Sequence, residues 1–228
     1  FIALLLTITS DVRIVLVKLA DRLDNIRAIK NFETSKQLSI ATETRLLYAP
    51  IAHRLGLYHI KSELEDISLR HIDPENYYSI ARKLKDTKKQ REDYIEQFSA
   101  PIKKILDQAG IKYEIKGRPK SVNSIYGKVV KKDIDISEIF DLFAIRVILD
   151  NVEKEHEKDA CWHIYSLVTN IYTPNPTRLR DWISTPRPSG YESLHTTVIG
   201  PDNHWVEVQI RTRRMDEMAE KGDAAHWK

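Results

Sequence analysis

The sequence has little of what marks a secreted or membrane-spanning protein. Cysteine occurs once, at Cys161, so no internal disulfide framework can form, and a reducing, cytoplasmic setting is favoured. The apolar run 1–9 is soon interrupted by Asp11 and is too short to cross a bilayer. It also lacks the charged front and the cleavage site of a signal peptide. We therefore expect no membrane association.

No strong excess of one charge is present either, since the net charge of +3 is too small to predict nucleic-acid binding by itself. An initiator methionine is missing, so we expect a fragment of a longer protein. The 228 residues are 42% hydrophobic and 30% charged, which is typical of one large or two small globular domains.

The first hundred residues have the apolar spacing of helices. Pro50 is expected to kink one of these helices, Gly56 to cap its end and Pro101 to separate the last two. The predicted helices cover 11–29, 35–56, 58–72, 74–98 and 101–110.

From about residue 111 the pattern changes to the alternation of strands. Strands are predicted at 111–118, 142–149, 193–200 and 204–212, with helices in 117–132, 160–172 and 215–227, and a proline-rich loop over 173–191. The expected fold class is α+β: an all-helical segment, then a mixed, mainly antiparallel sheet with flanking helices. We predict domain bounds of 1–72, 73–110 (linker helices) and 111–228.

The hairpin of the last two predicted strands carries unusual polar residues. Glu207, Gln209 and Arg211 alternate with apolar residues and therefore share one face. A turn centred on 201–203 would place Thr197 opposite Glu207 and His195 opposite Gln209. This face is either a solvated outer surface or part of a site that uses its mixture of donors, acceptors and a titratable ring.

Two charged residues mark the strand over 142–149. Arg146 interrupts an apolar run, where it needs a counter-charge or a ligand, and Asp141 stands just before the strand. Arg146 either forms a salt bridge or faces a nucleotide. Asp141 and Glu207 could together hold Mg²⁺, which binds one or two carboxylates in phosphate chemistry.

The stretch 117–132, GRPKSVNSIYGKVVKK, has five cations and no acid. Ser121 is a candidate N-cap, and a helix N-terminus beside Arg118 and Lys120 favours an anion. Lys128 lies two turns further along. The stretch is not a Walker loop. A phosphate site and an ordinary basic surface helix both remain open.

The loop before the hairpin adds Arg178, Arg180 and Arg187, followed by Tyr191. Basic residues with an exposed tyrosine suit a nucleotide, because the charges meet phosphates and the ring stacks on a base. The alternative is that Tyr191 packs over the end of the sheet.

Five blocks, taken in order, resemble the synthetase domain of the RelA/SpoT homologue family of bacterial alarmone enzymes. They read GRPKSVNSIYGK, DLFAIRVI, RLRDWISTPRPSGYESLHTTVIGP, VEVQIRT and AEKGDAAHW. Upstream, VKLADRLDNIR and YAPIAHRLGLYHIKSELEDISLR are similar to the end of the family's HD hydrolase domain and the helices that follow it. The resemblance implies a nucleotidyltransferase-like synthetase domain in a bifunctional-type enzyme, truncated within the hydrolase domain.

The implied reaction transfers the β,γ-pyrophosphoryl group of ATP to the 3′-hydroxyl of GTP or GDP, releases AMP and serves the stringent response. The resemblance implies an ATP site at Arg118, Lys120, Ser124, Lys128 and Arg146. It implies a GTP site at Arg180, Arg187, Tyr191 and His195. Catalysis would fall to Asp141, Glu207 and Gln209, with Asp141 and Glu207 binding Mg²⁺ or alternatively Mn²⁺.

The sequence departs from the family pattern at three places. The family's RxKD reads Arg178 to Asp181 with arginine in place of lysine, its PKxNGY reads 186–191 without the asparagine, and Asp216 stands where histidine is common. The first two bear on how the acceptor nucleotide is held rather than on the reaction.

For hydrolysis, only Asp21 and Asn25 match the family's metal-site residues, so we expect this chain not to hydrolyse (p)ppGpp. His53 is expected to pack or cap rather than bind metal.

A second hypothesis is a catalytically silent nucleotide- or RNA-binding module that uses the basic helix and the charged stretch 82–92. The parent protein could also act mainly as a hydrolase. Its ribosome or tRNA contacts would lie outside this chain, and no DNA partner is expected.

Overall fold

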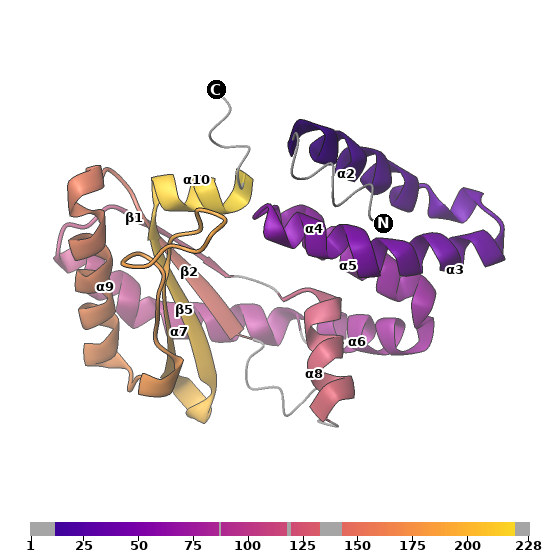
Figure 1. Cartoon of the computed structure of the whole chain (residues 1–228). Helices are drawn as coiled ribbons and strands as arrows, with labels where there is room; N and C mark the ends of the chain where they lie inside the picture. The colour runs from indigo at the N-terminus through magenta and orange to yellow at the C-terminus, as the bar shows by residue number, and fades with distance from the viewer. Residues whose placement is uncertain (1–11, 87, 118–119, 133–142, 222–228) are drawn as a thin grey trace.

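The computed structural model describes residues 12–86, 88–117, 120–132 and 143–221. Helices make up the first part of the chain, and a five-stranded mixed sheet with flanking helices follows (Figure 1). The predicted α+β class is therefore confirmed. Within the described ranges, the structure contains no helix that is both long and apolar enough to span a membrane.

The N-terminal helices pack around a core of their own. They are α2 (Val12–Arg27), α3 (Thr34–Glu43), α4 (Ala49–Arg54) and α5 (Tyr58–Ile72). Leu19, Ile26 and Leu64 are among the buried residues of this core. A π-helical turn, Thr44–Tyr48, stands just before Pro50, where the ring would crowd the preceding turn of a regular helix. Gly56 has a positive φ of 72°, as expected of the residue that ends this helix.

Two further helices lead into the sheet: α6 (Pro74–Asp86) and α7 (Lys88–Gln108). The predicted break at Pro101 is wrong, because α7 runs through this residue. Its apolar face explains the continuity, since Phe98, Ile102 and Leu106 are buried at helical spacing against the sheet core. Tertiary packing thus offsets the hydrogen bond that a proline removes from a helix interior.

The sheet has the strand order β1-β2-β5-β4-β3. Its strands are β1 (Tyr113–Gly117), β2 (Phe143–Leu149), β3 (Arg180–Asp181), β4 (Leu194–Ile199) and β5 (Trp205–Thr212). β2 and β5 pair in parallel, whereas the other neighbours are antiparallel. The short strand β3 lies within the predicted loop and was not expected.

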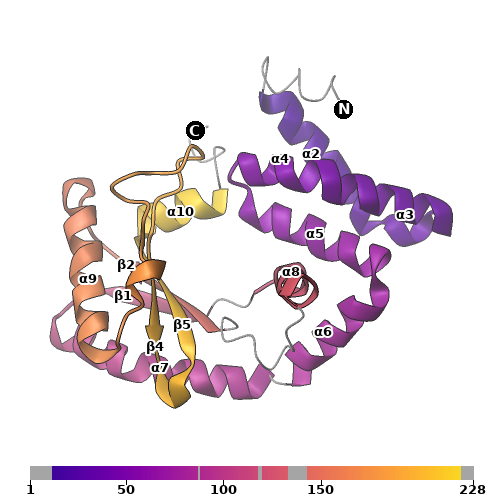
Figure 2. The same cartoon turned by 60° about the horizontal axis from the view of Figure 1, so that its bottom comes forward.

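One face of the sheet is apolar and is covered by α7 and by α9 (Glu157–Ile171), as Figures 1 and 2 show. Val206, Val208 and Ile210 of β5 point into this core, as their alternation predicts. Cys161 of α9 is buried in the same core, and burial raises the pKa of its thiol to about 12. We infer that Cys161 is a packing residue and not a nucleophile.

The β4–β5 hairpin has the predicted register: Thr197 pairs with Glu207, and His195 pairs with Gln209. Gly200 begins its turn against α7. A Cβ on Gly200 would lie 2.7 Å from Tyr94 Oη and 2.9 Å from Phe98 Cδ2, which explains the glycine. The turn is held further by a hydrogen bond from Tyr94 Oη to the Pro201 carbonyl, at 2.9 Å.

Two more helices complete the described fold. α10 (Arg213–Lys221) follows β5 and contacts β2 and β5. α8 (Val122–Lys132), which contains the basic stretch, packs mainly against α5 and α6, and Figures 1 and 2 both draw it beside those helices. The two regions with candidate site residues are therefore held by different parts of the fold: the hairpin belongs to the sheet, whereas the basic helix packs on the N-terminal helices.

Candidate functional site

A row of polar side chains crosses the whole sheet. Residues paired directly on neighbouring strands project from the same face, so the registers define the row. It consists of Lys116, Arg146, Gln209, His195 and Arg180, one from each strand. Glu207 and Arg211 extend it along β5, on either side of Gln209.

The centre of this polar face is buried while its two ends, Lys116 and Arg180, are exposed, so of the two alternatives a merely solvated outer surface does not describe the residues on β5. Gln209 is 0% exposed and Arg211 is 1% exposed. Ion pairs from Asp216 of α10 reach the same face. Buried polar groups of this kind must find partners within the protein or a ligand.

The buried groups form a ring of contacts around Glu207. Gln209 Nε2 donates to Glu207 Oε1 at 2.5 Å, and Arg211 Nη2 donates to Gln209 Oε1 at 3.0 Å. Arg211 Nη2 also donates to Tyr191 Oη at 2.7 Å, and Tyr191 Oη is 2.8 Å from His195 Nε2. His195 Nδ1 lies 3.6 Å from Glu207 Oε1, which closes the ring.

Arg146 forms salt bridges, one of the two alternatives that the sequence left open. Its Nη1 is 2.9 Å from Asp216 Oδ1 and 2.8 Å from Glu220 Oε1, both on α10. Arg211 shares Asp216, with Nη1 3.3 Å from the same oxygen. Within the described residues, the Nε of Arg146 is buried without a hydrogen-bond partner. An ion pair and an unused donor thus coexist on Arg146.

The loop before β4 supplies the aromatic side of the site. Tyr191 is only 9% exposed, so the expectation of an exposed ring is wrong. Its ring makes edge contacts with Trp182 and with Tyr58 of α5, at centroid distances of 5.7 and 5.5 Å. The Arg187 guanidinium lies 3.9 Å from the Trp182 ring centroid. The loop turns at Gly190, whose φ is +68°, and so brings Tyr191 back to the sheet.

Arg180, the other basic residue assigned to this loop, is exposed. Its Nη1 donates to the carbonyl oxygens of Thr177 and Leu179 at 2.9 and 2.8 Å. These bonds hold the guanidinium over the loop that precedes β3.

Sequence reasoning missed two aromatic residues that touch Tyr191. Trp182 directly follows the Arg178–Asp181 motif, and this position could have indicated a site residue. Nothing in the spacing, however, predicted its contact with Arg187. Tyr58 begins α5, more than a hundred residues away from Tyr191 in the chain, and no local pattern links the two.

The basic helix α8 begins as predicted. Ser121 caps it, since its Oγ accepts from the Ser124 amide at 3.3 Å and contacts Ser124 Oγ at 2.8 Å. A carboxylate from α5 also reaches this end, because the Asn123 amide donates to Asp66 Oδ1 at 2.8 Å. Lys120 and Lys128 are half-buried, and Ser124 is exposed. An anion does sit at this N-terminus, and it comes from the protein itself.

Other assigned residues contribute nothing to the ring as it is described. Arg118 and Asp141 lie outside the described residues. Asp21, which is exposed, and Asn25, which is half-buried, stand one turn apart on α2. His53 is exposed and makes an edge contact with Tyr58 at 5.6 Å.

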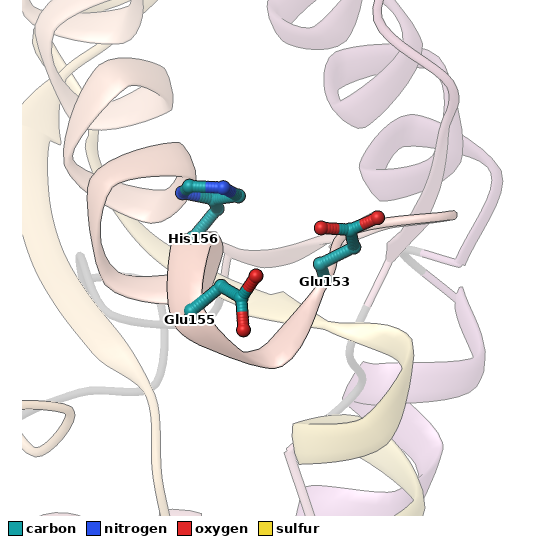
Figure 3. Close-up of side chains that lie close together, drawn as sticks. All are labelled: Glu153, Glu155 and His156. Atoms are coloured by element: carbon teal, nitrogen blue, oxygen red, sulfur yellow. The ribbon is translucent and has the colours of Figure 1, made fainter.

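For a metal, the ring offers the Glu207 carboxylate, a hard oxygen donor that suits Mg²⁺. A separate group, Glu153, Glu155 and His156, has ligand atoms within 4.8 Å of one another at the turn into α9 (Figure 3). All three are exposed and follow the end of β2, whereas Glu207 pairs with Ala144 near its beginning. This second group was not predicted and does not belong to the polar ring.

Fold and site together define an α+β protein with a buried polar network on one face of a mixed sheet. The family model described as "Region found in RelA / SpoT proteins" matches residues 117–228, and one described as "HD domain" matches residues 2–58. Residues 117–228 thus carry the region found in RelA/SpoT proteins, and residues 2–58 are similar to an HD domain.

Curated relatives match along the entire chain. A "GTP pyrophosphokinase" of Myxococcus xanthus is 43% identical over 228 residues, which is 100% of this chain and 29% of that protein. The "Bifunctional (p)ppGpp synthase/hydrolase SpoT" of Escherichia coli is 40% identical over 227 residues, 100% of this chain and 32% of the relative. The chain therefore spans about a third of the length of these relatives.

Among solved structures, the small alarmone synthetase 1 of Bacillus subtilis bound to its product pppGpp is similar. The identity is 25%, the TM-score is 0.45, and the match covers 62% of this chain and 78% of that one. At this TM-score the likeness adds nothing to the sheet order described above.

Proposed function

We propose that this chain is the part of a RelA/SpoT protein that synthesises (p)ppGpp. It acts as a GTP pyrophosphokinase: the 3′-hydroxyl oxygen of GTP or GDP attacks the β-phosphorus of ATP. The bond from that phosphorus to the α,β-bridging oxygen breaks, and AMP leaves. The observation that carries the proposal is the buried polar ring around Glu207, which has no evident role as packing alone.

On the ATP side, Arg146 holds the adenine together with Arg118. The unpartnered Nε of Arg146 supports this assignment, because an unused buried donor favours a ligand. Lys120, Ser124 and Lys128 of α8 meet the phosphates. The Asn123 amide at the α8 N-terminus is already taken by the Asp66 carboxylate, so these side chains, rather than that amide, supply the contacts.

On the acceptor side, Tyr191 stacks on guanine, and His195, Arg180 and Arg187 meet the phosphates. Tyr191 is held among Trp182, Tyr58 and Arg211, so its ring orientation is fixed before the nucleotide binds. The substitution of arginine for lysine at Arg180 keeps the charge.

Glu207 takes the proton of the attacking hydroxyl, and Gln209 holds its carboxylate in place. A Mg²⁺ ion held by Glu207 and Asp141 would neutralise charge on the phosphates. The remaining work is positioning, which dominates in phosphoryl transfer. ATP, GTP or GDP and Mg²⁺ are the implied ligands, and cytoplasmic localisation stays a prediction.

The decisive experiment incubates the chain with ATP, GTP and Mg²⁺ and separates the nucleotides. We expect AMP and a 3′-pyrophosphorylated guanosine nucleotide in equal amounts. Asp141→Ala should abolish both products while the protein stays folded. Salt-sensitive RNA binding without AMP release would instead favour the silent binding module.

The predicted domain bounds and the lack of hydrolysis belong to the same proposal. Residues 1–72 form the end of a hydrolase domain, 73–110 the linker helices and 111–228 the synthetase. Only Asp21 and Asn25 match the family's hydrolase metal site, so the chain should not bind Mn²⁺ there or release pyrophosphate from ppGpp. Measurable ppGpp hydrolysis would refute this part alone.

A further inference from the structure

Arg211 is a fully buried arginine to which neither the motifs nor the proposed reaction assigns a task. Of the residues that the structure describes, it is the largest of those with less than 2% exposure. Burying a guanidinium is costly unless every direction meets an acceptor. A packing role alone would be served by an apolar residue of similar volume. The contacts of Arg211 therefore call for an explanation.

These contacts join three elements at one point. Nη2 donates to Tyr191 Oη on the loop and to Gln209 Oε1 on β5, at 2.7 and 3.0 Å. Nη1 donates to Asp216 Oδ1 on α10 at 3.3 Å. The guanidinium carbon also lies 5.2 Å from the Tyr191 ring centroid.

A guanidinium has donors and no acceptor, so it dictates the direction of each bond that continues from it. Gln209 must present Oε1 to Arg211, which leaves its Nε2 to donate to Glu207. The Tyr191 oxygen accepts from Arg211, so the Tyr191 hydroxyl proton is available for His195 Nε2, 2.8 Å away.

In the neutral imidazole one nitrogen accepts and the other carries the proton. If His195 Nε2 accepts from Tyr191, the proton is on Nδ1, and Nδ1 lies 3.6 Å from Glu207 Oε1. In that arrangement both branches from Arg211 end at the Glu207 carboxylate: Gln209 donates a hydrogen bond to it, and the His195 Nδ1–H lies nearby at a longer distance. A change at Arg211 would let the amide and the imidazole reverse.

We propose that Arg211 is a positioning residue that sets the hydrogen-bond direction around Glu207 and fixes Tyr191. It thereby couples the acceptor tyrosine to the catalytic carboxylate without touching either substrate. The catalytic consequence rests on the proposed synthetase function, whereas the proton arrangement of His195 does not. The two can therefore fail separately.

The test that needs no turnover is ¹⁵N NMR of protein labelled at the histidine imidazoles, with His195 assigned by comparison with His195→Gln. We expect wild type to show the Nδ1–H form. Tyr191→Phe, which removes only the hydroxyl, should shift His195 towards the Nε2–H form. An Nε2–H signal in wild type, or no change in Tyr191→Phe, would overturn the proposal.

The kinetic test compares Arg211→Lys, which keeps donors without acceptors, with Arg211→Met, which keeps the length alone. Arg211→Met should lower kcat about 10²-fold, a loss typical of a small misplacement of catalytic groups, with the KM for ATP little changed. Arg211→Lys should recover at least part of that loss. Equal kcat values in both variants would contradict a role in hydrogen-bond direction.

Arg213→Met is the matched control, because Arg213 also pairs with two carboxylates, Asp150 and Glu114, away from the ring. It should change the melting temperature but not kcat.

If Arg211→Met does not fold, Tyr191→Phe combined with Arg211→Lys replaces it. The effect of Tyr191→Phe on kcat should then be smaller in the Lys background than in wild type, and full additivity would overturn the proposal. If wild type releases no AMP, the proposed function fails while the NMR result still decides the placement of the proton.

Discussion

The β4–β5 hairpin and the basic helix α8 both carry residues assigned to nucleotides, yet they are held in place very differently. The polar face of the hairpin is part of a paired sheet, and its buried side chains bond one another. α8 rests on α5 and α6 through a small apolar cluster around Ile80 and Ile125, and through the Asp66 carboxylate at its first turn. The site around Glu207 is therefore built into the sheet, whereas the phosphate-side helix depends on the N-terminal helices.

The largest difference between the two regions should be seen when the hairpin is changed. Glu207→Gln keeps an oxygen for the Gln209 amide but removes the base and the metal-binding charge. We expect kcat to fall by about 10²–10⁴-fold, the typical contribution of a general base, with an unchanged melting temperature. AMP release measured beside circular dichroism checks both. A wild-type rate would remove Glu207 from its assigned role.

The support of α8 can be weakened without touching the sheet. Ile125 is 1% exposed in the cluster with Ile80, so Ile125→Ala should cost about 2 kcal/mol of unfolding free energy, the low end for such truncations. Val130→Ala on the same helix is the control, because Val130 is 54% exposed and should change stability by less than about 0.5 kcal/mol. Urea unfolding of both variants measures the difference, and equal midpoints would contradict this account of the packing.

A smaller effect should come from the carboxylate at the start of α8. Asp66→Ala leaves the Asn123 amide without its acceptor and should cost about 1 kcal/mol, as for a lost helix cap. Asp66→Asn keeps an acceptor oxygen and should cost less. Faster hydrogen exchange of the Asn123 amide in the Ala variant would show that the stability is lost at this hydrogen bond. Unchanged exchange would argue against the contact.

The smallest effect is a pH dependence at the same residue. Burial raises the pKa of Asp66, so the folded state holds this proton at pH values where the unfolded chain has lost it. Stability due to Asp66 therefore rises as the pH falls from above the raised pKa towards its usual range. The melting temperature of Asp66→Asn minus that of wild type should become more negative from pH 7 to pH 4, roughly the range above a normal aspartate pKa, because wild type gains stability there and asparagine does not titrate. A constant difference would show that Asp66 is not desolvated.

Much of the fold was readable from the sequence because local signals were consistent. The α5 bounds, the hairpin register and the Ser121 cap follow from helical spacing, alternation and a capping residue, each acting over a few positions. Pro101 shows the limit of such signals. Proline predicts a helix end, but the apolar face of α7 buried against the sheet overrides it.

The site was predicted only in part, for a related reason. Alternation placed Glu207, Gln209 and Arg211 on one face, and the apolar run around Arg146 indicated that it needs a counter-charge or a ligand, of which the structure shows a counter-charge. The exposure of Tyr191 was wrong, because Tyr58 and Trp182 come from other parts of the chain to cover it. The roles of the individual residues stay predictions.

By itself, the sequence determined which residues share a face, where the elements run and which family the motifs resemble, because each is a matter of spacing along the chain. Only the tertiary structure decided that β2 lies parallel to β5, that α10 brings Asp216 to two arginines, and that α8 rests on α5 and α6. These outcomes depend on contacts between distant segments. Burial on the polar face then turned a row of alternating residues into a ring of directed hydrogen bonds.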